Sequence, residues 1–477
     1  MPFRPRTTAL VALTAAGVVA LAGCSSSSSS GSGASGASGS PSVTVSAYGG
    51  QQPANATQLQ QVVDSYAAAH YLPGSVVGVW RPGQPDAVIT QGYSNVANKT
   101  PMKSDDTFII ASTTKSFVGT VALQLIGEGK LSLDSKLSEF QPNFPNAANI
   151  TVEQLLNMTS GIYDYSTDPK VIAQLAENPE KVWPHEELVN IAAANPPYFA
   201  PGQGWHYTNT NTVLIGLIIE KVTGNKLEQE IASRITTPLG LKNTFLPATT
   251  AENKTTATGY NLDQDNGTFL ASPNVDPSFL WAAGAMISNL NDLKVWAKAL
   301  GTGQMITPQL QAQRTQFQPI TLAGTPPFYT AMDPAYGLAM ERYQLPPNEF
   351  IGHSGKTSNF NTQMYYQPST GSILITLINT DTVAGYGPLF FATVAQAAIP
   401  GSFPGVTDPQ ASASAAAGSS PAAGASGAAA SASPAASGSA SASGSGAPAS
   451  PTATGAPSAS SGSATAPASP SATGSAS

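Results

Sequence analysis

The sequence predicts an α+β fold in which both ends of the folded segment supply strands to one antiparallel sheet. A helix and then a hairpin are predicted near the start of this segment, and a hairpin and then a helix near its end. Between them, residues 131–300 carry mostly helical patterns and irregular loops. This order is typical of a sheet flanked by helices, with a mostly helical insertion lobe and a cleft between the two lobes.

The first elements follow from hydrophobic periodicity. Apolar residues recur at three- and four-residue steps over residues 56–70, which predicts an amphipathic helix. Residues 75–80 and 87–91 are rich in β-branched side chains and are joined by a Pro- and Gly-containing turn at 82–85. They therefore predict a hairpin.

Residues 108–119 read Phe-Ile-Ile-Ala-Ser-Thr-Thr-Lys-Ser-Phe-Val-Gly. They predict a short buried segment that leads into an apolar helix. If the helix begins near Ser112, Lys115 lies one turn later and the two side chains share a face. A serine attacks poorly until a base takes its proton. A lysine can be that base where burial and the positive helix N-terminus disfavour its ammonium form. Alone, the Ser-x-x-Lys pattern is too short to indicate a site, and a structural helix is the alternative.

A second polar stretch, residues 199–212, precedes an apolar helix predicted over 213–222. Tyr207 and Asn209 are therefore expected on a loop just before a helix, where functional groups often stand on a rigid base. A packed loop tyrosine is the structural alternative.

A third stretch, Phe-Ile-Gly-His-Ser-Gly-Lys-Thr at 350–357, places His353 near Gly355 in a predicted strand. A glycine there lets a ligand backbone approach closely, whereas a structural strand histidine is the alternative.

The last elements are a second hairpin and a closing helix. Residues 361–367 and 372–378 form the predicted strands, and residues 368–371 (Pro-Ser-Thr-Gly) form the turn between them. Residues 389–399 predict the helix.

The two ends of the chain differ in composition from the rest. Residues 1–24 combine arginines, an apolar run and Leu-Ala-Gly-Cys, which predicts an export signal too short to span a membrane. The signal resembles that of bacterial lipoproteins, with Cys24 lipidated after cleavage; an ordinary secretory signal is the alternative. Residues 25–52 predict a flexible Ser/Gly-rich linker, and residues 406–477 a disordered Ala/Ser/Gly/Pro-rich tail. The folded domain is therefore expected at 53–405.

Composition excludes several classes of function. The net charge is −7 and basic runs are absent, which argues against nucleic acid as a partner. The four histidines have no ligand spacing, which argues against a zinc site. We find no glycine-rich phosphate loop, so neither metal nor cofactor is expected. Cys24 is the only cysteine, which rules out an intramolecular disulfide.

Taken together, the three motifs resemble one superfamily. Ser-x-x-Lys, Tyr-x-Asn and His-x-Gly, in this order, are similar to the motifs of serine β-lactamases and penicillin-binding proteins. The branch most resembled contains class C β-lactamases, D-alanyl-D-alanine carboxypeptidases and related esterases. The resemblance covers roughly residues 55 to 400 and also includes these stretches: 106–115, 155–161, 201–209, 238–241, 283–288 and 336–338. It implies a β-lactamase/transpeptidase-like fold.

The resemblance also implies roles for individual residues. Ser112 would be the nucleophile that forms an acyl-enzyme, and Lys115 the base or proton relay. Tyr207 would exchange protons with the leaving group and the incoming water, which needs a phenol whose pKa is lowered by neighbouring cations. Asn209 would position Lys115 and the substrate amide, and His353 would support Tyr207 electrostatically.

The remaining implied roles concern the predicted strand at 350–356. Gly355 would let the substrate backbone lie against this strand. The main-chain N–H groups of Ser112 and Lys356 would hold the oxyanion.

Two positions depart from the family pattern. Met158 stands where the family usually has histidine, and we expect no loss of activity from this structural change. Lys356 stands where a small residue or threonine is commoner. We hypothesise that its ammonium reaches the cleft and binds an anionic substrate group, and a solvated surface lysine is the alternative.

The resemblance implies a serine hydrolase, with a D-alanyl-D-alanine carboxypeptidase-like activity on peptidoglycan peptides as the favoured prediction. A class C-like β-lactamase, a small-molecule esterase and a penicillin-binding lipoprotein without turnover remain alternatives. The expected partners are a peptide, β-lactam or ester substrate and, through the lipid anchor, the outer face of the bacterial cell membrane.

Overall fold

The computed structural model describes the residues in these ranges: 45–46, 56–263, 266–320, 326–344, 346–381 and 386–408. All of them belong to the first of two units into which the chain divides, residues 1–419. The predicted signal with Cys24, most of the predicted linker and nearly all of the predicted tail lie outside the described residues. The domain boundaries at 53 and 405 stay predictions.

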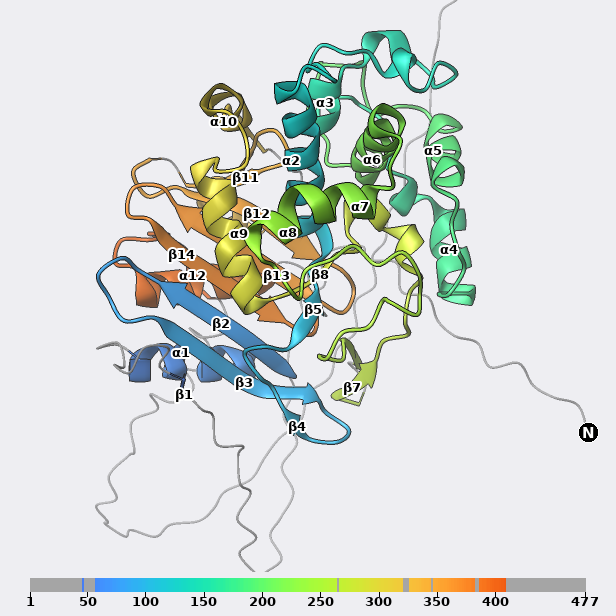
Figure 1. Ribbon diagram of the computed structural model, residues 1–477. Coiled ribbons are helices and arrows are strands. Elements are labelled where there is room, and N and C mark those ends of the chain that lie inside the picture. Colours follow the sequence, from blue (N-terminus) through green and yellow to red (C-terminus); the bar gives the residue numbers. More distant parts are fainter. Residues whose placement is uncertain are drawn as a thin grey trace, which may run out of the picture. The chain divides into compact units, whose positions relative to one another are not determined.

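The chain folds into an antiparallel sheet and a helical lobe (Figure 1). The strands are β1 Val45–Ser46, β2 Gly74–Trp80, β3 Ala87–Asn95, β4 Thr100–Pro101, β5 Thr107–Ile109, β6 Tyr260–Asp263, β7 Thr268–Ala271, β8 Ile287–Asn289, β9 Gln318–Pro319, β10 Ala335–Tyr336, β11 Glu341–Tyr343, β12 Phe350–Lys356, β13 Asn361–Gln367 and β14 Ser372–Ile378. The helices are α1 Ala56–Ala69, α2 Thr114–Gly127, α3 Val152–Leu156, α4 Pro169–Glu177, α5 His185–Ala193, α6 Asn209–Thr223, α7 Leu227–Ile231, α8 Thr237–Leu239, α9 Leu290–Thr302, α10 Pro308–Arg314, α11 Pro327–Ala331 and α12 Tyr386–Ala398.

The main sheet joins strands from both ends of the fold, as the sequence predicted. Its order is β1-β3-β2-β14-β13-β12-β11-β10-β9, with β4 paired to β3. The central contact is between β2 and β14, where Val77 lies opposite Thr376. The two ends of the fold therefore close one sheet, and the helical lobe is the insertion between them.

Helices cover both faces of this sheet. Helices α1 and α12 pack together on one face, and α9 packs on the other face against β13 and β14. Alternate side chains of a strand reach different cores: Val76 and Ile375 face the helical lobe, while Val77 and Leu374 face α1 and α12. All seven residues of β14 are buried, which explains its continuous apolar run.

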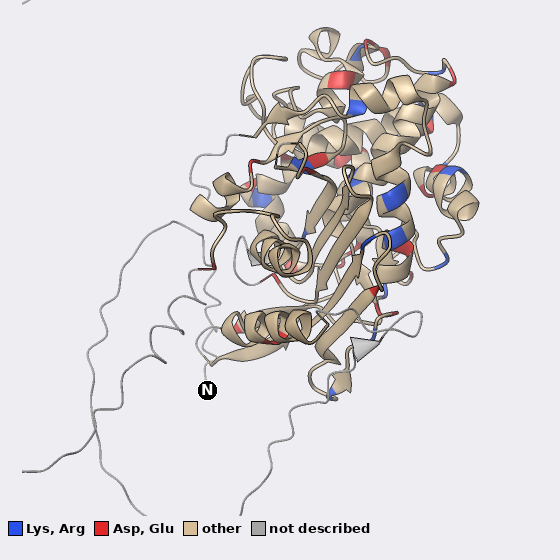
Figure 2. Cartoon of the chain, turned by 90° about the vertical axis from the view of Figure 1, so that its left-hand side faces the viewer, with Lys and Arg blue, Asp and Glu red and all other residues tan. Residues whose placement is uncertain are grey.

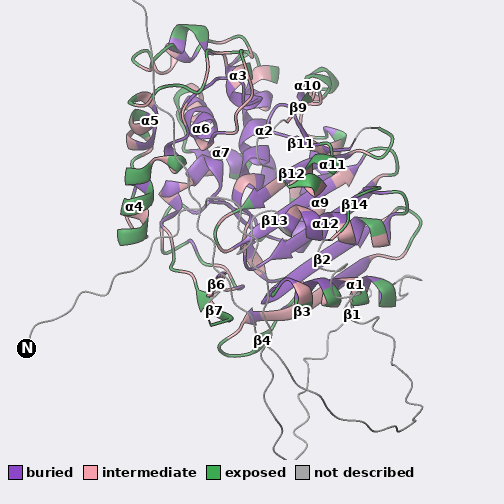
Figure 3. Cartoon of the chain, turned by 180° about the vertical axis from the view of Figure 1, so that it is seen from behind, coloured by how far each residue is buried: buried purple, intermediate pink, exposed green. Residues whose placement is uncertain are grey.

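The helical lobe is built around α2 and α6. Both helices are buried along most of their length, whereas α4, α5 and α10 expose one side to solvent (Figure 3). The predicted helical middle also contains three short strands. One of them, β8, pairs with β5, the strand that leads into α2. The start of α2 is therefore held by a segment that comes much later in the sequence.

Charged side chains are rare in the sheet and are interspersed by sign over the helices (Figure 2). Strands β2, β3, β13 and β14 carry none, whereas β11 carries Glu341 and Arg342 and β12 ends in Lys356. Charge in the sheet is therefore concentrated on β11 and β12, of which β12 packs against α2.

Candidate active site

Ser112 lies in a tight turn that is fixed on both sides. It belongs to a 3-10 turn, Ala111–Thr113, which runs directly into α2. Ala111 has a φ of 47°, a left-handed conformation that is costly for a residue with a Cβ. The N–H of Ile110 donates to the Met286 carbonyl at 2.9 Å, and the Thr113 hydroxyl donates to the His353 carbonyl at 3.3 Å. The half-buried serine is thus held rigidly between β8 and β12.

Lys115 lies one helical turn beyond Ser112, as the spacing predicted, and its side chain is fully buried. Its Nζ is 3.1 Å from the Ser112 Oγ, 2.7 Å from the Asn209 Oδ1 and 2.7 Å from the Ala283 carbonyl oxygen. A neutral amine has two N–H donors and one lone pair. The two carbonyl-type oxygens accept only, so they take both N–H groups, and the lone pair is left for the serine proton.

The protonation state of Lys115 suits this role. Burial lowers its pKa from 10.5 to about 7, and the negative charges of Asp164 and Glu341 oppose part of the shift. A pKa near neutrality lets the amine accept a proton and return it within one turnover.

Asn209 connects Lys115 to Asp164, a buried acid. Asn209 was predicted to lie on the loop before α6. It is in fact the first residue of this helix, because the side chain of the preceding residue, Thr208, caps the helix. The Asn209 Nδ2 donates to the Ser166 Oγ at 2.9 Å, and that hydroxyl donates to Asp164 at 2.9 Å. This chain of hydrogen bonds fixes the amide so that its oxygen faces Lys115.

Tyr207 also lies beside Lys115, whose Nζ is 4.7 Å from the centre of the phenol ring. Its hydroxyl oxygen is buried and makes no hydrogen bond of ordinary geometry to a described residue. The expected lowering of its pKa was wrong. Burial, reinforced by the negative charge of Glu341, raises the pKa of Tyr207 well above 10, although contact with Ser112 opposes the rise. The side chain is therefore a phenol that can give a proton.

His353 lies behind Tyr336, and its electrostatic support of Tyr207 stays a prediction. It is completely buried on β12, and its Nε2 is 3.0 Å from the Tyr336 hydroxyl. Tyr336 in turn packs edge-on against Tyr207, with ring centres 6.1 Å apart. Burial lowers the pKa of His353 below 6.5, so the ring is mainly neutral near pH 7 and is connected to Tyr207 through Tyr336.

The sequence analysis missed Glu341, an acid at the start of β11. Its carboxylate accepts hydrogen bonds from the Ser354 N–H at 2.8 Å, the Ser354 hydroxyl at 3.0 Å and the Tyr365 hydroxyl at 2.6 Å. It also lies 3.6 Å from His353. Glu341 follows the Tyr-Gly-Leu stretch at 336–338, which carried part of the resemblance, but nothing in the local pattern indicates a buried acid. The Ala283 carbonyl was missed for the same reason, since a backbone acceptor has no sequence signature.

Gly355 is required by the packing of the protein itself, and the predicted approach of a substrate backbone to this position stays a prediction. A Cβ at this position would lie 2.0 Å from the Ile110 carbonyl oxygen. The glycine therefore lets β12 pack against the turn that carries Ser112, and its missing side chain points at protein and not at a substrate.

Lys356 ends β12 at the mouth of the site, half-exposed. Its ammonium lies 2.7 Å from the carboxylate of Asp381, whose pKa burial raises to about 6. The side chain is thus neither a free anion-binding group nor a purely solvated lysine, and the hypothesis that it binds an anionic substrate group stays a prediction. Met158, the other departure, is buried and its sulfur accepts a hydrogen bond from Asn211, as befits a structural position.

Two cavities meet at these residues. One of about 540 Å³ contains Ser112, Tyr207 and Tyr336 in its wall, and another of about 650 Å³ extends past Asn209 toward the loops of the helical lobe. They share four lining residues: Asn209, Lys356, Thr357 and Ser358. A substrate can therefore occupy both cavities while its reacting carbonyl lies at Ser112.

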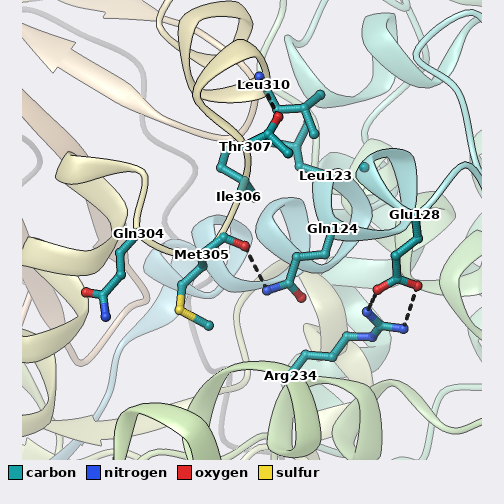
Figure 4. Close-up of a pocket in the computed structure, with 10 residues that line it drawn as sticks. Leu123, Gln124, Glu128, Arg234, Gln304, Met305, Ile306, Thr307 and Leu310 are labelled. Atoms are coloured by element: carbon teal, nitrogen blue, oxygen red, sulfur yellow. Dashed lines mark hydrogen bonds and ion pairs between the residues drawn. The ribbon is translucent and has the colours of Figure 1, made fainter.

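A further cavity, of about 490 Å³, lies at the opposite end of α2 (Figure 4). Its wall contains the Glu128–Arg234 ion pair and a hydrogen bond from Gln124 to the Met305 carbonyl. At a rise of about 1.5 Å per residue, Glu128 is roughly 20 Å from Ser112, so this cavity is separate from the site.

Two properties of the described part of the chain bear on other kinds of site. No group of three or more His, Cys, Asp or Glu side chains there is arranged to hold a metal ion. No helix there has the length and apolar character needed to cross a membrane.

Comparison with known proteins identifies the family of this site. The sequence profile of the beta-lactamase family, described as "Beta-lactamase", matches residues 59–398. The chain belongs to the beta-lactamase family. Its fold and its serine hydrolase machinery are those of this family. A penicillin-binding protein homologue from Pyrococcus abyssi, 24% identical, shares the fold.

Individual relatives of this family member are known by sequence and by structure. A D-aminopeptidase of Cereibacter sphaeroides is 26% identical over 328 residues, covering 68% of this chain and 60% of that protein. Protein flp of Staphylococcus aureus is 26% identical over 332 residues, covering 68% and 63%. The chain thus spans about 60% of the length of the curated relatives it matches.

Two solved structures resemble the fold closely. A D-stereospecific amidohydrolase from Streptomyces sp. superposes with a TM-score of 0.63 at 30% identity, over 73% of this chain and 99% of that one. A D-amino acid amidase from Ochrobactrum anthropi SV3, complexed with L-phenylalanine amide, gives a TM-score of 0.62 at 27% identity, over 72% and 97%.

Proposed function

We propose that this serine hydrolase cleaves amide bonds whose acyl residue has the D configuration, through an acyl-enzyme on Ser112. The observation that carries the proposal is the arrangement of Lys115, whose two acceptors leave its lone pair for the Ser112 proton. The D configuration is supported by the printed names of three relatives, a D-aminopeptidase, a D-stereospecific amidohydrolase and a D-amino acid amidase. The predicted D-alanyl-D-alanine carboxypeptidase-like activity belongs to the same class.

The geometry supports a two-step reaction. In acylation, Lys115 takes the Ser112 proton as Oγ bonds to the substrate carbonyl carbon, and the carbon–nitrogen bond then breaks. The Tyr207 phenol gives a proton to the departing amine and regains one from the Lys115 ammonium nearby. In deacylation, a water loses its proton to this pair, its oxygen bonds to the carbonyl carbon, and Ser112 leaves with a proton.

The oxyanion of each step needs fixed donors. We assign this role to the main-chain N–H groups of Ser112 and Lys356, which border the same cavity. The rigid turn that holds Ser112 and the ladder that holds β12 would keep these donors in place without reorganisation.

Mass spectrometry of the intact protein with a panel of substrates tests the proposal. The panel contains D- and L-phenylalanine amide, diacetyl-L-lysyl-D-alanyl-D-alanine, a penicillin and a chromogenic ester, with the Ser112→Ala variant as control. We expect turnover of D-configured amides that requires Ser112 and little turnover of the L-amide. Equal rates for the two enantiomers would refute the D specificity. A persistent penicillin adduct without amide turnover would instead favour a penicillin-binding protein, and fast turnover confined to the ester or the penicillin would favour an esterase or a β-lactamase.

We also propose that the protein is exported and lipid-anchored at the outer face of the membrane, on the strength of the signal at 1–24 and of Cys24. Labelling with a fatty-acid analogue in a bacterial host checks this. The label should appear on the wild type and be lost in Cys24→Ser. Equal labelling of both proteins would refute the anchor.

A further inference from the structure

The cavity of about 650 Å³ next to the catalytic residues contains unsatisfied polar groups. Much of its wall is apolar, including Leu175, Val275 and Phe279. Two polar atoms in its wall, the Asn253 Oδ1 and the Ser272 Oγ, are buried without a hydrogen-bond partner. An acceptor buried in this way is costly unless something else donates to it.

The orientation of Asn253 is fixed by its neighbours. The side chain is 7% exposed, and its Nδ2 donates to the Val275 carbonyl at 2.7 Å and to the Asn274 Oδ1 at 3.3 Å. Because both partners only accept, the nitrogen end of the amide must face them. The free end is therefore the oxygen, which can accept and cannot donate.

The charges around this cavity also favour a donor. Asp276 in its wall is buried, receives hydrogen bonds from Thr250 and Ser278, and forms no ion pair with a described cation. Of the two lysines in the wall, Lys356 is neutralised by Asp381 and Lys254 is exposed. The buried part of the cavity thus presents uncompensated negative charge and unused acceptor atoms.

We propose that Asn253 and Ser272 form a subsite for a protonated amine carried by the acyl part of the substrate. The subsite rests on the proposed function, because the acyl part must enter this cavity while its carbonyl lies at Ser112. An ammonium matches both unused oxygens and the Asp276 charge, whereas a carboxylate would meet the Asn253 acceptor and the Asp276 charge with the wrong sign. Two sources can supply the amine: the α-amine of an N-terminal D-residue, or a side-chain amine farther along a peptide.

Two matched pairs of substrates distinguish these sources. D-alanine p-nitroanilide and its N-acetyl derivative differ in the α-amine, whereas Nα-acetyl-L-lysyl-D-alanyl-D-alanine and its diacetyl form differ in the ε-amine. For each pair the readout is the ratio of kcat/KM for the free amine to that for the acetylated form. The variants are Asn253→Ala and Ser272→Ala, with Asn98→Ala on an exposed turn outside the cavity as control. Thermal unfolding verifies that each variant is folded.

We expect the free amine to be preferred about tenfold or more in one pair, since hydrogen bonds to charged groups are the strong ones. The pair that discriminates identifies the source of the amine. Asn253→Ala should bring that ratio close to one, Ser272→Ala should lower it partly, and Asn98→Ala should leave it unchanged.

Two results would overturn the subsite. They are ratios near one in both pairs for the wild type, or a preference that survives both Asn253→Ala and Ser272→Ala. Should Asn253→Ala prove unfolded, the wild-type ratios and Ser272→Ala still decide, because the Ser272 hydroxyl has no partner to lose. Efficient cleavage of acetylated D-substrates with ratios of one would refute the subsite and leave the proposed function standing, whereas no cleavage of any D-amide would refute the function itself.

Discussion

Titration of Lys115 gives the most direct test of the catalytic arrangement. A lysine with its ordinary pKa of 10.5 is neutral in only about one molecule in three thousand at pH 7. With the pKa lowered to about 7 by burial, about half of the molecules carry the neutral base at pH 7 and nearly all do at pH 9. Because only the neutral amine can accept the Ser112 proton, the acylation rate should rise with pH through about 7 and then level off.

The assay is single-turnover acylation with a chromogenic ester between pH 5.5 and 9. An ester leaves without needing a proton, so the rate reports activation of the nucleophile. The pKa of Tyr207 is raised far above this range, whereas His353, with a pKa below 6.5, and Asp381, with a pKa of about 6, bear only on the acid end of the profile. A rate that is flat over the range, or a midpoint above about 9, would refute the assignment of Lys115 as the base.

A variant separates the base from the rest of the site. Lys115→Arg keeps the positive charge, but a guanidinium does not lose its proton in this range. We expect acylation to fall by about 10²- to 10⁴-fold, the usual contribution of a general base. Lys298→Arg on the exposed side of α9 is the matched control and should change nothing.

Three further predictions concern the groups around this base. Tyr207→Phe removes the proton donor and should slow amide hydrolysis by about 10²- to 10⁴-fold but ester acylation much less; equal losses on both substrates would contradict the role. Glu341→Gln removes a charge that raises the pKa of Lys115, so the acid limb of the acylation profile should move to lower pH, and a shift upward would contradict the coupling. Gly355→Ala places a Cβ 2.0 Å from the Ile110 carbonyl oxygen and should lower the free energy of unfolding by about 1–3 kcal/mol, as measured by denaturant titration. Unchanged stability and activity would show that β12 does not pack tightly against the turn that carries Ser112.

Elements with strong local signals were predicted almost to the residue. The second hairpin has the predicted strands, 361–367 and 372–378, because β-branched runs and a Pro-Ser-Thr-Gly turn specify it locally. The first helix, predicted over 56–70, is observed as Ala56–Ala69. The boundary at Asn209 was wrong, because helix capping by Thr208 extends α6 toward its N-terminus beyond its apolar pattern.

The four residues around the nucleophile were predicted to lie together, but Glu341, the Ala283 carbonyl and the electrostatics of the site were not predicted. Ser112, Lys115, Asn209 and Tyr207 come together as the resemblance implied. The direction of the Tyr207 pKa shift depends on burial and on Glu341, which follows it by more than one hundred residues. The effect of a residue so distant in the sequence on this pKa cannot be predicted from the local sequence pattern.

By itself, the sequence determined the order of the elements and the antiparallel sheet closed by both ends, and it indicated the candidates for the nucleophile and its base. Periodicity, turn residues and motif spacing are local properties, and they survive without a three-dimensional structure. Only the tertiary structure showed that the Ala283 carbonyl and Asn209 direct the lone pair of Lys115, that Gly355 is required by Ile110, and that an unused acceptor on Asn253 borders the cleft. These properties depend on burial and on which distant groups meet, and both are decided only when the chain packs.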